Sequence, residues 1–226
     1  VKPSLIVDAA AKVGGIGANN SFPVEFLADN VRIQSNLMEA AHAADVEKFI
    51  FLGSSCIYPR DCAQPIKEEY LLTGPLEETN SAYAVAKIAG IELIKSFRKE
   101  YGRTWISLMP TNLYGINDNF ELQGSHVLPA FIRRFVEAAE KKAPIETLWG
   151  TGSPKREFLH VDDLAAAVVH LGNNYNSSEH INIGTGEDLT IKELAELVAE
   201  LAGFEGELAW DSSKPDGTPR KVLDVS

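Results

Sequence analysis

Residues 48–55 read Lys-Phe-Ile-Phe-Leu-Gly-Ser-Ser, and this stretch decides the fold class. The unbroken apolar run 49–52 predicts a strand buried on both faces, because a strand with one wet face alternates apolar and polar residues. Polar residues begin abruptly at Gly53 and Ser54, so the strand ends there. Ligands of parallel sheets bind outside the carboxyl ends of the strands, which makes the residues after Leu52 candidates for a site.

Strands and helices alternate on either side of this run. We expect strands at 4–7, 105–109, 146–149 and 180–183, and helices at 26–44, 81–101, 127–141, 162–171 and 191–202. The alternation predicts an α/β fold, a Rossmann-like doubly wound parallel sheet with helices on both faces, joined to a small C-terminal α/β substrate domain.

Several local signals mark where these elements begin and turn. Asp162 or Asp163 is placed to cap the helix at 162–171, and Thr190 with Glu193 resembles a capping box. Residues 14–17, Gly-Gly-Ile-Gly, do not follow the G-x-G-x-x-G spacing, so we interpret them as a turn near a cofactor. Residues 59–80 and 210–220 are expected to be loops, the latter with a turn at 214–217.

The composition excludes several classes of protein. The 226 residues are 45% hydrophobic and carry a net charge of −11. A general nucleic-acid or anionic-membrane surface needs basic patches, so neither partner is expected. A run of 18 apolar residues, which a membrane-spanning helix needs, does not occur in the sequence. The two cysteines, Cys56 and Cys62, fit neither a disulfide framework nor a zinc pattern, so we expect no metal and a reducing, cytoplasmic location.

Tyr83 and Lys87 lie four residues apart on one predicted helix, so both side chains point the same way. A phenol has a pKa near 10 and is a poor acid–base catalyst at neutral pH. A neighbouring ammonium favours the phenolate, so Lys87 is expected to lower the pKa of Tyr83. Ser54 ends a buried strand upstream and can share a substrate oxygen with Tyr83.

Four ordered segments carry a resemblance to the extended short-chain dehydrogenase/reductase superfamily. They are Ser-Ser-x-x-Tyr at 54–58, Tyr-x-x-x-Lys at 83–87, Pro-x-Asn-x-Tyr-Gly at 110–115 and Arg-x-Phe-x-His-Val-x-Asp at 156–163. Three longer stretches, 53–59, 109–115 and 213–221, together with Ser-His-Val at 125–127, resemble the GDP-L-fucose synthase family of NAD-dependent epimerases/dehydratases.

This resemblance implies a two-step, NADPH-dependent conversion of GDP-4-keto-6-deoxy-D-mannose to GDP-L-fucose. A ketone at C4 acidifies the hydrogens on C3 and C5, and inversion at either carbon needs a base on one face and an acid on the other. By resemblance, Cys56 is the base and His126 the acid. Ser54 and Tyr83 would hold the C4 oxygen, and Tyr83 would protonate it on reduction.

The resemblance also implies the binding residues. NADP(H) would contact Lys87 and His126 together with residues that follow two strands, namely Leu52, Gly53, Ser54, Ser55, Pro110, Thr111, Asn112 and Leu113. The GDP-sugar would contact Arg134, Trp149, Arg156 and Asp216. Arg156 suits a diphosphate because its guanidinium can donate two parallel hydrogen bonds.

The domain organisation is also implied by this resemblance. Residues 1–115, with about 156–183, form a partial NADP-binding Rossmann domain, and residues 116–155 and 184–226 form the substrate subdomain. The superfamily's glycine-rich first turn is not found, so we expect about 50 further residues before Leu5, at roughly 30 residues per βαβ unit, and a continuation past Ser226. Helices 26–44 and 81–101 are those that pair in dimers of the superfamily, so we expect a homodimer.

Two alternatives stay open at this point. One is another nucleotide-sugar enzyme of the extended family, a 4-epimerase or a 4,6-dehydratase. A dehydratase is expected to carry an acidic pair where Ser55 and Cys56 stand, and a 4-epimerase does not need Cys56 with His126. The other alternative is a non-catalytic NADP-binding module, which has no use for Ser54, Tyr83 and Lys87 together.

Overall fold

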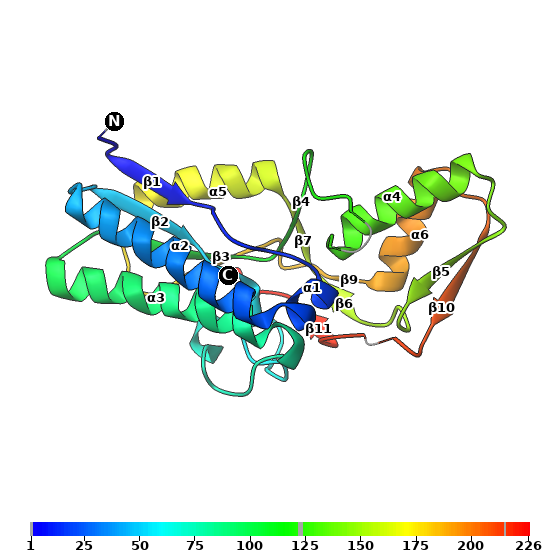
Figure 1. Ribbon diagram of the computed structural model, residues 1–226, viewed down its shortest axis with the longest axis horizontal. Helices are drawn as coiled ribbons and strands as arrows, with labels where there is room; N and C mark the ends of the chain where they lie inside the picture. The colour runs from blue at the N-terminus through cyan, green and yellow to red at the C-terminus, as the bar shows by residue number, and fades with distance from the viewer. Residues whose placement is uncertain (1, 122–123, 215) are drawn as a thin grey trace.

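The computed structural model describes residues 2–121, 124–214 and 216–226. Its centre is a parallel sheet with the strand order β1-β2-β3-β8 (Figure 1). The strands are β1 Leu5–Asp8, β2 Lys48–Leu52, β3 Ile106–Pro110 and β8 Ile181–Ile183. In the register of this sheet Ile50 lies between Val7 and Ile106. The predicted α/β fold with a parallel sheet is confirmed.

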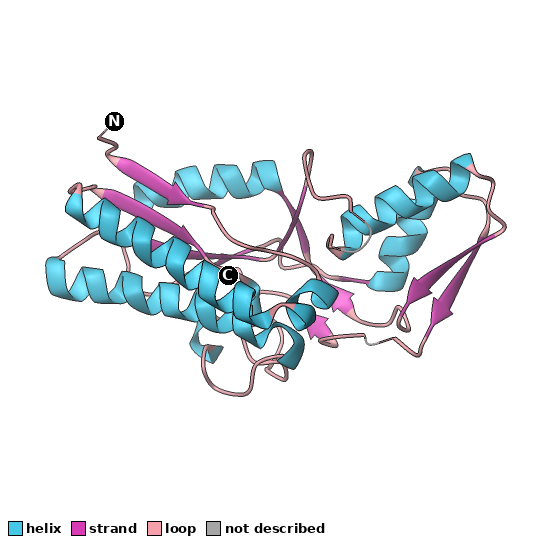
Figure 2. Cartoon of the chain, viewed as in Figure 1, coloured by secondary structure: helices cyan, strands magenta, loops and turns pink. Residues whose placement is uncertain are grey.

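Strand β2 is covered on both faces, as its apolar sequence predicts. Phe49 and Phe51 join the core beneath α2, Pro23–Ala43, and α3, Ser81–Tyr101. Ile50 points the other way, into the core beneath α5, Val161–Asn174. Figure 2 shows these helices on the two sides of the sheet. Burial of each such side chain stabilises the fold by about 1.5–3 kcal/mol, so the sheet holds the ends of β2 and β3 rigidly.

Helix α3 approaches the sheet closely because Gly90 has no side chain. A Cβ at this position would lie 2.4 Å from Cζ of Phe51. Gln34 of α2 also donates a buried hydrogen bond of 2.7 Å to the Ala86 carbonyl, which ties the two helices together. Helix α3 ends where predicted, at Gly102, whose φ of 68° is the left-handed conformation that favours glycine.

A second core lies at one end of the molecule, at the right of Figure 1. It is built by the helices α4, Val127–Glu140, and α6, Ile191–Leu201, with the parallel strands β5, Ile145–Trp149, and β10, Glu207–Asp211. Phe135, Leu148, Leu194 and Phe204 are buried in it.

Short strand pairs connect the two cores. Strand β4, Asn112–Tyr114, pairs with β7, Phe158–His160. Strand β6, Lys155–Arg156, lies between β11, Arg220–Lys221, and β9, Leu189–Thr190. The segment between β2 and α3, which includes the predicted loop 59–80, contains three single 3₁₀ turns at Ser55–Ile57, Glu68–Tyr70 and Glu78–Asn80.

Three local expectations are corrected. Gly15 is the N-cap residue of a helix α1, Ile16–Ser21, so residues 14–17 open a helix where a turn was expected. Helix α2 begins at Pro23 because proline is already set for the first helical position. His160, not Asp162 or Asp163, caps α5, since its Nδ1 accepts a hydrogen bond of 3.2 Å from the backbone N–H of Asp162.

The expected capping box of Thr190 and Glu193 is confirmed. The expectation of a loop over 210–220 is wrong at both ends, because β10 and β11 overlap this range. Pro215 of the predicted turn at 214–217 lies outside the described residues. Within the described part of the chain, no helix is both long and apolar enough to cross a membrane.

Candidate active site

Ser54 stands at the carboxyl end of β2 and links two other candidate residues. Its Oγ accepts a hydrogen bond of 3.2 Å from the backbone N–H of Cys56, which caps the 3₁₀ turn that carries the cysteine. Its side chain also acts on Tyr83, where it lowers the pKa of the phenol. Ser54, which follows the end of β2, therefore connects this strand to both Cys56 and Tyr83.

Lys87 is buried at the same end of β2, with 3% of its surface exposed. Its Nζ donates a hydrogen bond of 2.8 Å to the Leu52 carbonyl and lies 4.8 Å from the centre of the Phe51 ring. The centre of the Tyr83 ring is 5.9 Å away. Burial lowers the pKa of Lys87 to about 8, against the opposing effect of Asp8.

The environment of Tyr83 differs from the expectation. Burial raises the pKa of this phenol, the charge of Cys56 raises it further, and the Ser54 side chain lowers it. Lys87 is not among the groups that shift this pKa, so the expected lowering by Lys87 is not found, and loss of water around the hydroxyl dominates. Tyr83 is therefore neutral, which is the form that donates a proton.

Cys56 is paired with a cation that comes from the far end of the chain. Lys221 of β11 places its Nζ 3.3 Å from the Cys56 Sγ. Burial alone would raise the pKa of Cys56, but the charge and hydrogen bond of Lys221, the Ser54 side chain and the charge of Arg156 together lower it. A lowered pKa favours the thiolate, which is the form that acts as a base.

His126 precedes the first turn of α4 as its N-cap residue. Part of the residue is exposed, yet the protein around its ring lowers the pKa of His126 by desolvation. Asp118 acts on it in the opposite direction, and Lys221 adds to the lowering. Lys221 therefore acts on both the thiol and the imidazole.

The residues expected to bind the cofactor lie at the carboxyl ends of β2 and β3. Several of them are already tied to the protein. The backbone N–H of Thr111 donates to the Ile183 carbonyl at 2.9 Å, and Nδ2 of Asn112 donates to the Glu157 carbonyl at 2.8 Å. The edge is rigid, and it carries the Lys87 ammonium that suits a ribose hydroxyl. The residues present thus fit a dinucleotide at this edge.

The four residues expected to bind the GDP-sugar separate into two pairs. Arg156 and Asp216 lie on the side of Cys56, since the charges of Cys56 and Asp216 both raise the pKa of Arg156. Arg134 instead forms an ion pair with Glu146 and donates to the Thr147 carbonyl. Trp149 is 66% exposed and lies under Lys214, whose Nζ is 5.5 Å from the ring centre.

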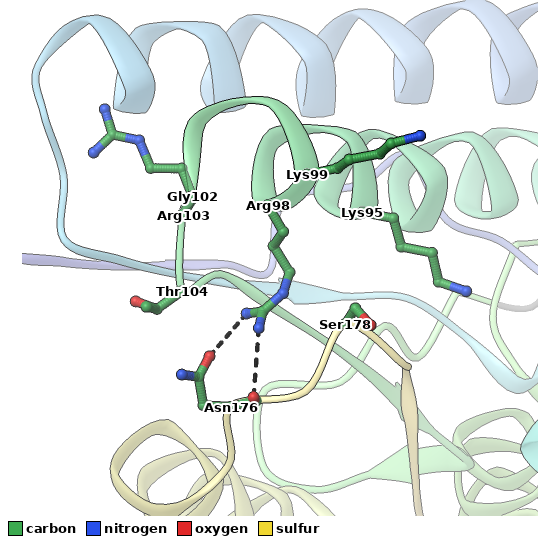
Figure 3. Close-up of a pocket in the computed structure, with 8 residues that line it drawn as sticks. All are labelled: Lys95, Arg98, Lys99, Gly102, Arg103, Thr104, Asn176 and Ser178. Atoms are coloured by element: carbon green, nitrogen blue, oxygen red, sulfur yellow. Dashed lines mark hydrogen bonds between the residues drawn. The ribbon is translucent and has the colours of Figure 1, made fainter.

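A basic pocket lies at the opposite edge of the sheet and holds none of these residues (Figure 3). It is lined by the end of α3 and by the segments that lead into β3 and β8. Arg98 crosses it and donates to the Trp105 carbonyl and to Asn176 at 2.8 and 2.9 Å. Three of its four cations, Lys95, Arg98 and Arg103, are paired with other residues of the chain, which is typical of a structural junction.

Lys221 is the site residue that the sequence analysis did not single out. It stands in the segment 213–221, which the sequence analysis used only for its resemblance. The parallel pairing of β11 with β6 sets Lys221 opposite Arg156. A strand of two residues has no periodic signal, so its position could not be read from the sequence.

The parallel sheet and the Tyr83–Lys87 pair at its carboxyl edge define the Rossmann-like class of α/β enzymes. The family profile described as the NAD dependent epimerase/dehydratase family matches residues 1–184, and the chain belongs to this family.

Individual relatives are similar over nearly the whole chain. A probable GDP-L-fucose synthase 1 of Oryza sativa subsp. japonica is 60% identical over 99% of this chain and 69% of the rice protein. The GDP-L-fucose synthase of Escherichia coli (strain K12) is 55% identical over 96% of this chain and 71% of its own length. A crystal structure of a GDP-L-fucose synthetase from Naegleria fowleri bound to NADP is 30% identical, with a TM-score of 0.89 over 99% of this chain and 69% of that one.

Proposed function

We propose that this protein converts GDP-4-keto-6-deoxy-D-mannose to GDP-L-fucose in two steps, an epimerisation at C3 and C5 followed by reduction at C4, with NADPH. The observation that carries the proposal is the hydrogen bond from Lys221 to Cys56, next to the Ser54 side chain, which also acts on Tyr83. One pocket then holds a base for carbon acids and a proton donor for a ketone oxygen. The names of the similar proteins from rice and E. coli support the same substrate.

In the first step the Cys56 thiolate takes the proton from C3 or C5, and the negative charge moves to the C4 oxygen. Ser54 and Tyr83 donate hydrogen bonds to this oxygen, where the charge develops. His126, in its protonated form, delivers a proton to the opposite face of the carbon, which completes the inversion. Because its pKa is lowered, it takes up a proton again before the second carbon is inverted. Lys221 favours the thiolate before the proton is taken. After the transfer the thiol is neutral, and the charge of Lys221 favours its return to the thiolate.

In the second step the neutral Tyr83 phenol gives its proton to the C4 oxygen. NADPH, when bound, supplies the hydride for C4. Lys87 binds next to the carboxyl end of β2 and has further N–H groups beyond the one that the Leu52 carbonyl accepts. These groups would hold ribose hydroxyls and stabilise the phenolate that remains.

Three further parts of the proposal concern organisation. Residues 1–115 and about 156–183 would hold the cofactor, and residues 116–155 and 184–226 the GDP-sugar. Arg134 would have to exchange its Glu146 partner for a phosphate. Exposed apolar side chains on α2 and α3, among them Val24 at 77% and Val85 at 46%, support a homodimer through these helices. Its mass in solution, from light scattering, tests the dimer.

The other candidates from the sequence have less support. Ser55 and Cys56 are not acidic, which speaks against a 4,6-dehydratase. A plain 4-epimerase does not need the Cys56–Lys221 pair. A non-catalytic module does not need Ser54, Tyr83 and Lys87 together.

The test incubates the protein with GDP-4-keto-6-deoxy-D-mannose and NADPH in D₂O. The unmodified protein should incorporate deuterium at C3 and C5 and oxidise NADPH. Cys56→Ser should lose deuterium incorporation yet still reduce some unepimerised ketone. Cys62→Ser, in the same loop, is the matched control and should behave as the unmodified protein. Absence of both exchange and NADPH oxidation in the unmodified protein would overturn the proposal.

A further inference from the structure

Strand β1 ends in a buried acid that the proposed mechanism does not use. Asp8 is 3% exposed, and its Oδ1 accepts a hydrogen bond of 3.1 Å from the backbone N–H of Ala10. Its Oδ2 is buried and has no hydrogen-bond partner among the described residues. A carboxylate oxygen left in this state costs free energy, so its surroundings must offset the cost in another way.

The positive charge of Lys87 offsets the cost of burying the Asp8 carboxylate. Asp8 is the register partner of Phe51, and the Lys87 ammonium lies over the Phe51 ring and bonds to the carbonyl of the next residue, Leu52. The acid and the ammonium are thus held at one corner of the sheet, both almost fully buried. The groups that face Lys87 are Asp8 from β1, the carbonyl and ring from β2, and Tyr83 from its own helix.

The two charges support one another. Burial raises the pKa of Asp8, the Ala10 N–H lowers it, and Lys87 lowers it further. Burial lowers the pKa of Lys87, and Asp8 raises it. Each group therefore favours the charged form of the other in a place where burial alone would neutralise both.

We propose that Asp8 is a positioning residue of the proton relay, whose carboxylate keeps Lys87 in its charged, hydrogen-bonding form beside Tyr83. Asp8 acts through Lys87 and does not touch the substrate. The inference rests on the proposed function for the role of Lys87, but the Asp8–Lys87 coupling itself can be measured without any reaction.

The first experiment measures the coupling in the full chain by NMR, with lysine labelled by ¹³C at Cε. Lys87→Met assigns the Lys87 signal. Asp8→Asn keeps the shape and the bond to Ala10 but removes the charge, so the pKa of Lys87 should fall by about one unit or more. Asp29→Asn, which removes an exposed acid near Lys12, is the control and should leave Lys87 unchanged. An unchanged Lys87 titration in Asp8→Asn would refute the proposal.

The reciprocal measurement guards against poor folding of Asp8→Asn. In Lys87→Met, the pKa of Asp8, followed by its carboxyl ¹³C shift, should rise above its value in the unmodified protein. A constant Asp8 titration would also refute the coupling.

The second experiment follows NADPH-dependent reduction against pH. Because Lys87 must be charged, activity should fall as the pH rises through the pKa of Lys87, and Asp8→Asn should move this fall to lower pH by the shift seen in the NMR titration. Asp8→Glu should restore part of it. A merely structural Asp8 would change the rate equally at all pH values. Failure of the unmodified protein to reduce the ketone would refute the proposed function, while the NMR result would still decide the coupling.

Discussion

The Lys221 Nζ lies 3.3 Å from the Cys56 Sγ, although 165 residues separate the two in the sequence. The thiol comes from the turn after β2 and the ammonium from β11 near the end of the chain. Lys221 also acts on His126, so a single cation contributes to the pKa of both groups proposed for the epimerisation. The proton-transfer chemistry therefore depends on how the tail is anchored.

Replacement of Lys221 by Met should raise the pKa of Cys56, because burial then acts with one opposing cation fewer. The thiolate fraction at neutral pH should fall about tenfold for each unit of this rise. The rate of alkylation by iodoacetamide against pH measures it, in a background with Cys62→Ser. Lys214→Met removes a neighbouring cation that lies over Trp149 and should leave the rate unchanged. Equal rates in Lys221→Met and Lys214→Met would contradict the pairing.

His126 should respond in opposite directions to two single substitutions. Asp118 raises the pKa of His126, so Asp118→Asn should lower it further below its usual range. Lys221 lowers this pKa, so Lys221→Met should raise it. Proton NMR of the imidazole ring, assigned with His126→Gln, gives the titrations. Shifts of the same sign in both variants would contradict the opposite effects assigned to Asp118 and Lys221.

Glu157 anchors the tail, and its loss should destabilise the fold. Its side chain is fully buried, and it accepts backbone N–H bonds of 2.8 Å from Gly186 and 2.9 Å from Leu223. Glu157→Gln replaces one carboxylate oxygen with an NH₂ group, which cannot accept a hydrogen bond from these N–H groups. We therefore expect the free energy of unfolding to fall by about 2 kcal/mol or more.

Urea unfolding measures this loss. The control is Glu193→Gln, which changes an exposed capping-box acid and should cost about 1 kcal/mol or less. Because Leu223 follows Lys221 by two residues, Glu157→Gln should also slow alkylation of Cys56. A Glu157 variant no less stable than the Glu193 variant would be inconsistent with this anchoring role.

The sequence predicts the sheet well because its signals are local. The apolar run of β2 and the amphipathic pattern of α3 appear at the residues expected, 48–52 and 81–101. Both lie in the core, where burial enforces the pattern. The N-cap of α5 was mispredicted because the helix begins at Val161, before either aspartate, so His160 occupies the cap position and accepts the hydrogen bond from the backbone N–H of Asp162.

The site is less predictable than the sheet. Ser54, Tyr83 and Lys87 can be grouped from the ends of elements, but the places of Lys221 and Asp8 depend on contacts between segments far apart in the chain. Lys221 reaches Cys56 through a strand of two residues, and Asp8 reaches Lys87 through the register of β1 with β2. Residue spacing carries no information on either contact.

The neutral phenol of Tyr83 leads to the last prediction, which separates the two proposed steps. Tyr83→Phe keeps the ring, whose centre lies 6.5 Å from that of Phe26, so the fold should be retained. The variant has no proton to give, and the rate of NADPH oxidation should fall by roughly 10²–10⁴-fold. Deuterium exchange at C3 and C5 should fall far less, because Cys56 and His126 remain.

Ser54→Ala provides the contrast. Ser54 bonds to the Cys56 backbone and acts on the Tyr83 side chain, so its loss should slow exchange and reduction together. Tyr101→Phe, on the same helix but at its far, exposed end, is the matched control and should change neither rate. If Tyr83→Phe reduced the ketone as fast as Tyr101→Phe, the proton would have to come from another group. His126 would then be the nearest candidate, and the NADPH oxidation rate of Tyr83→Phe should vanish on the further change His126→Gln.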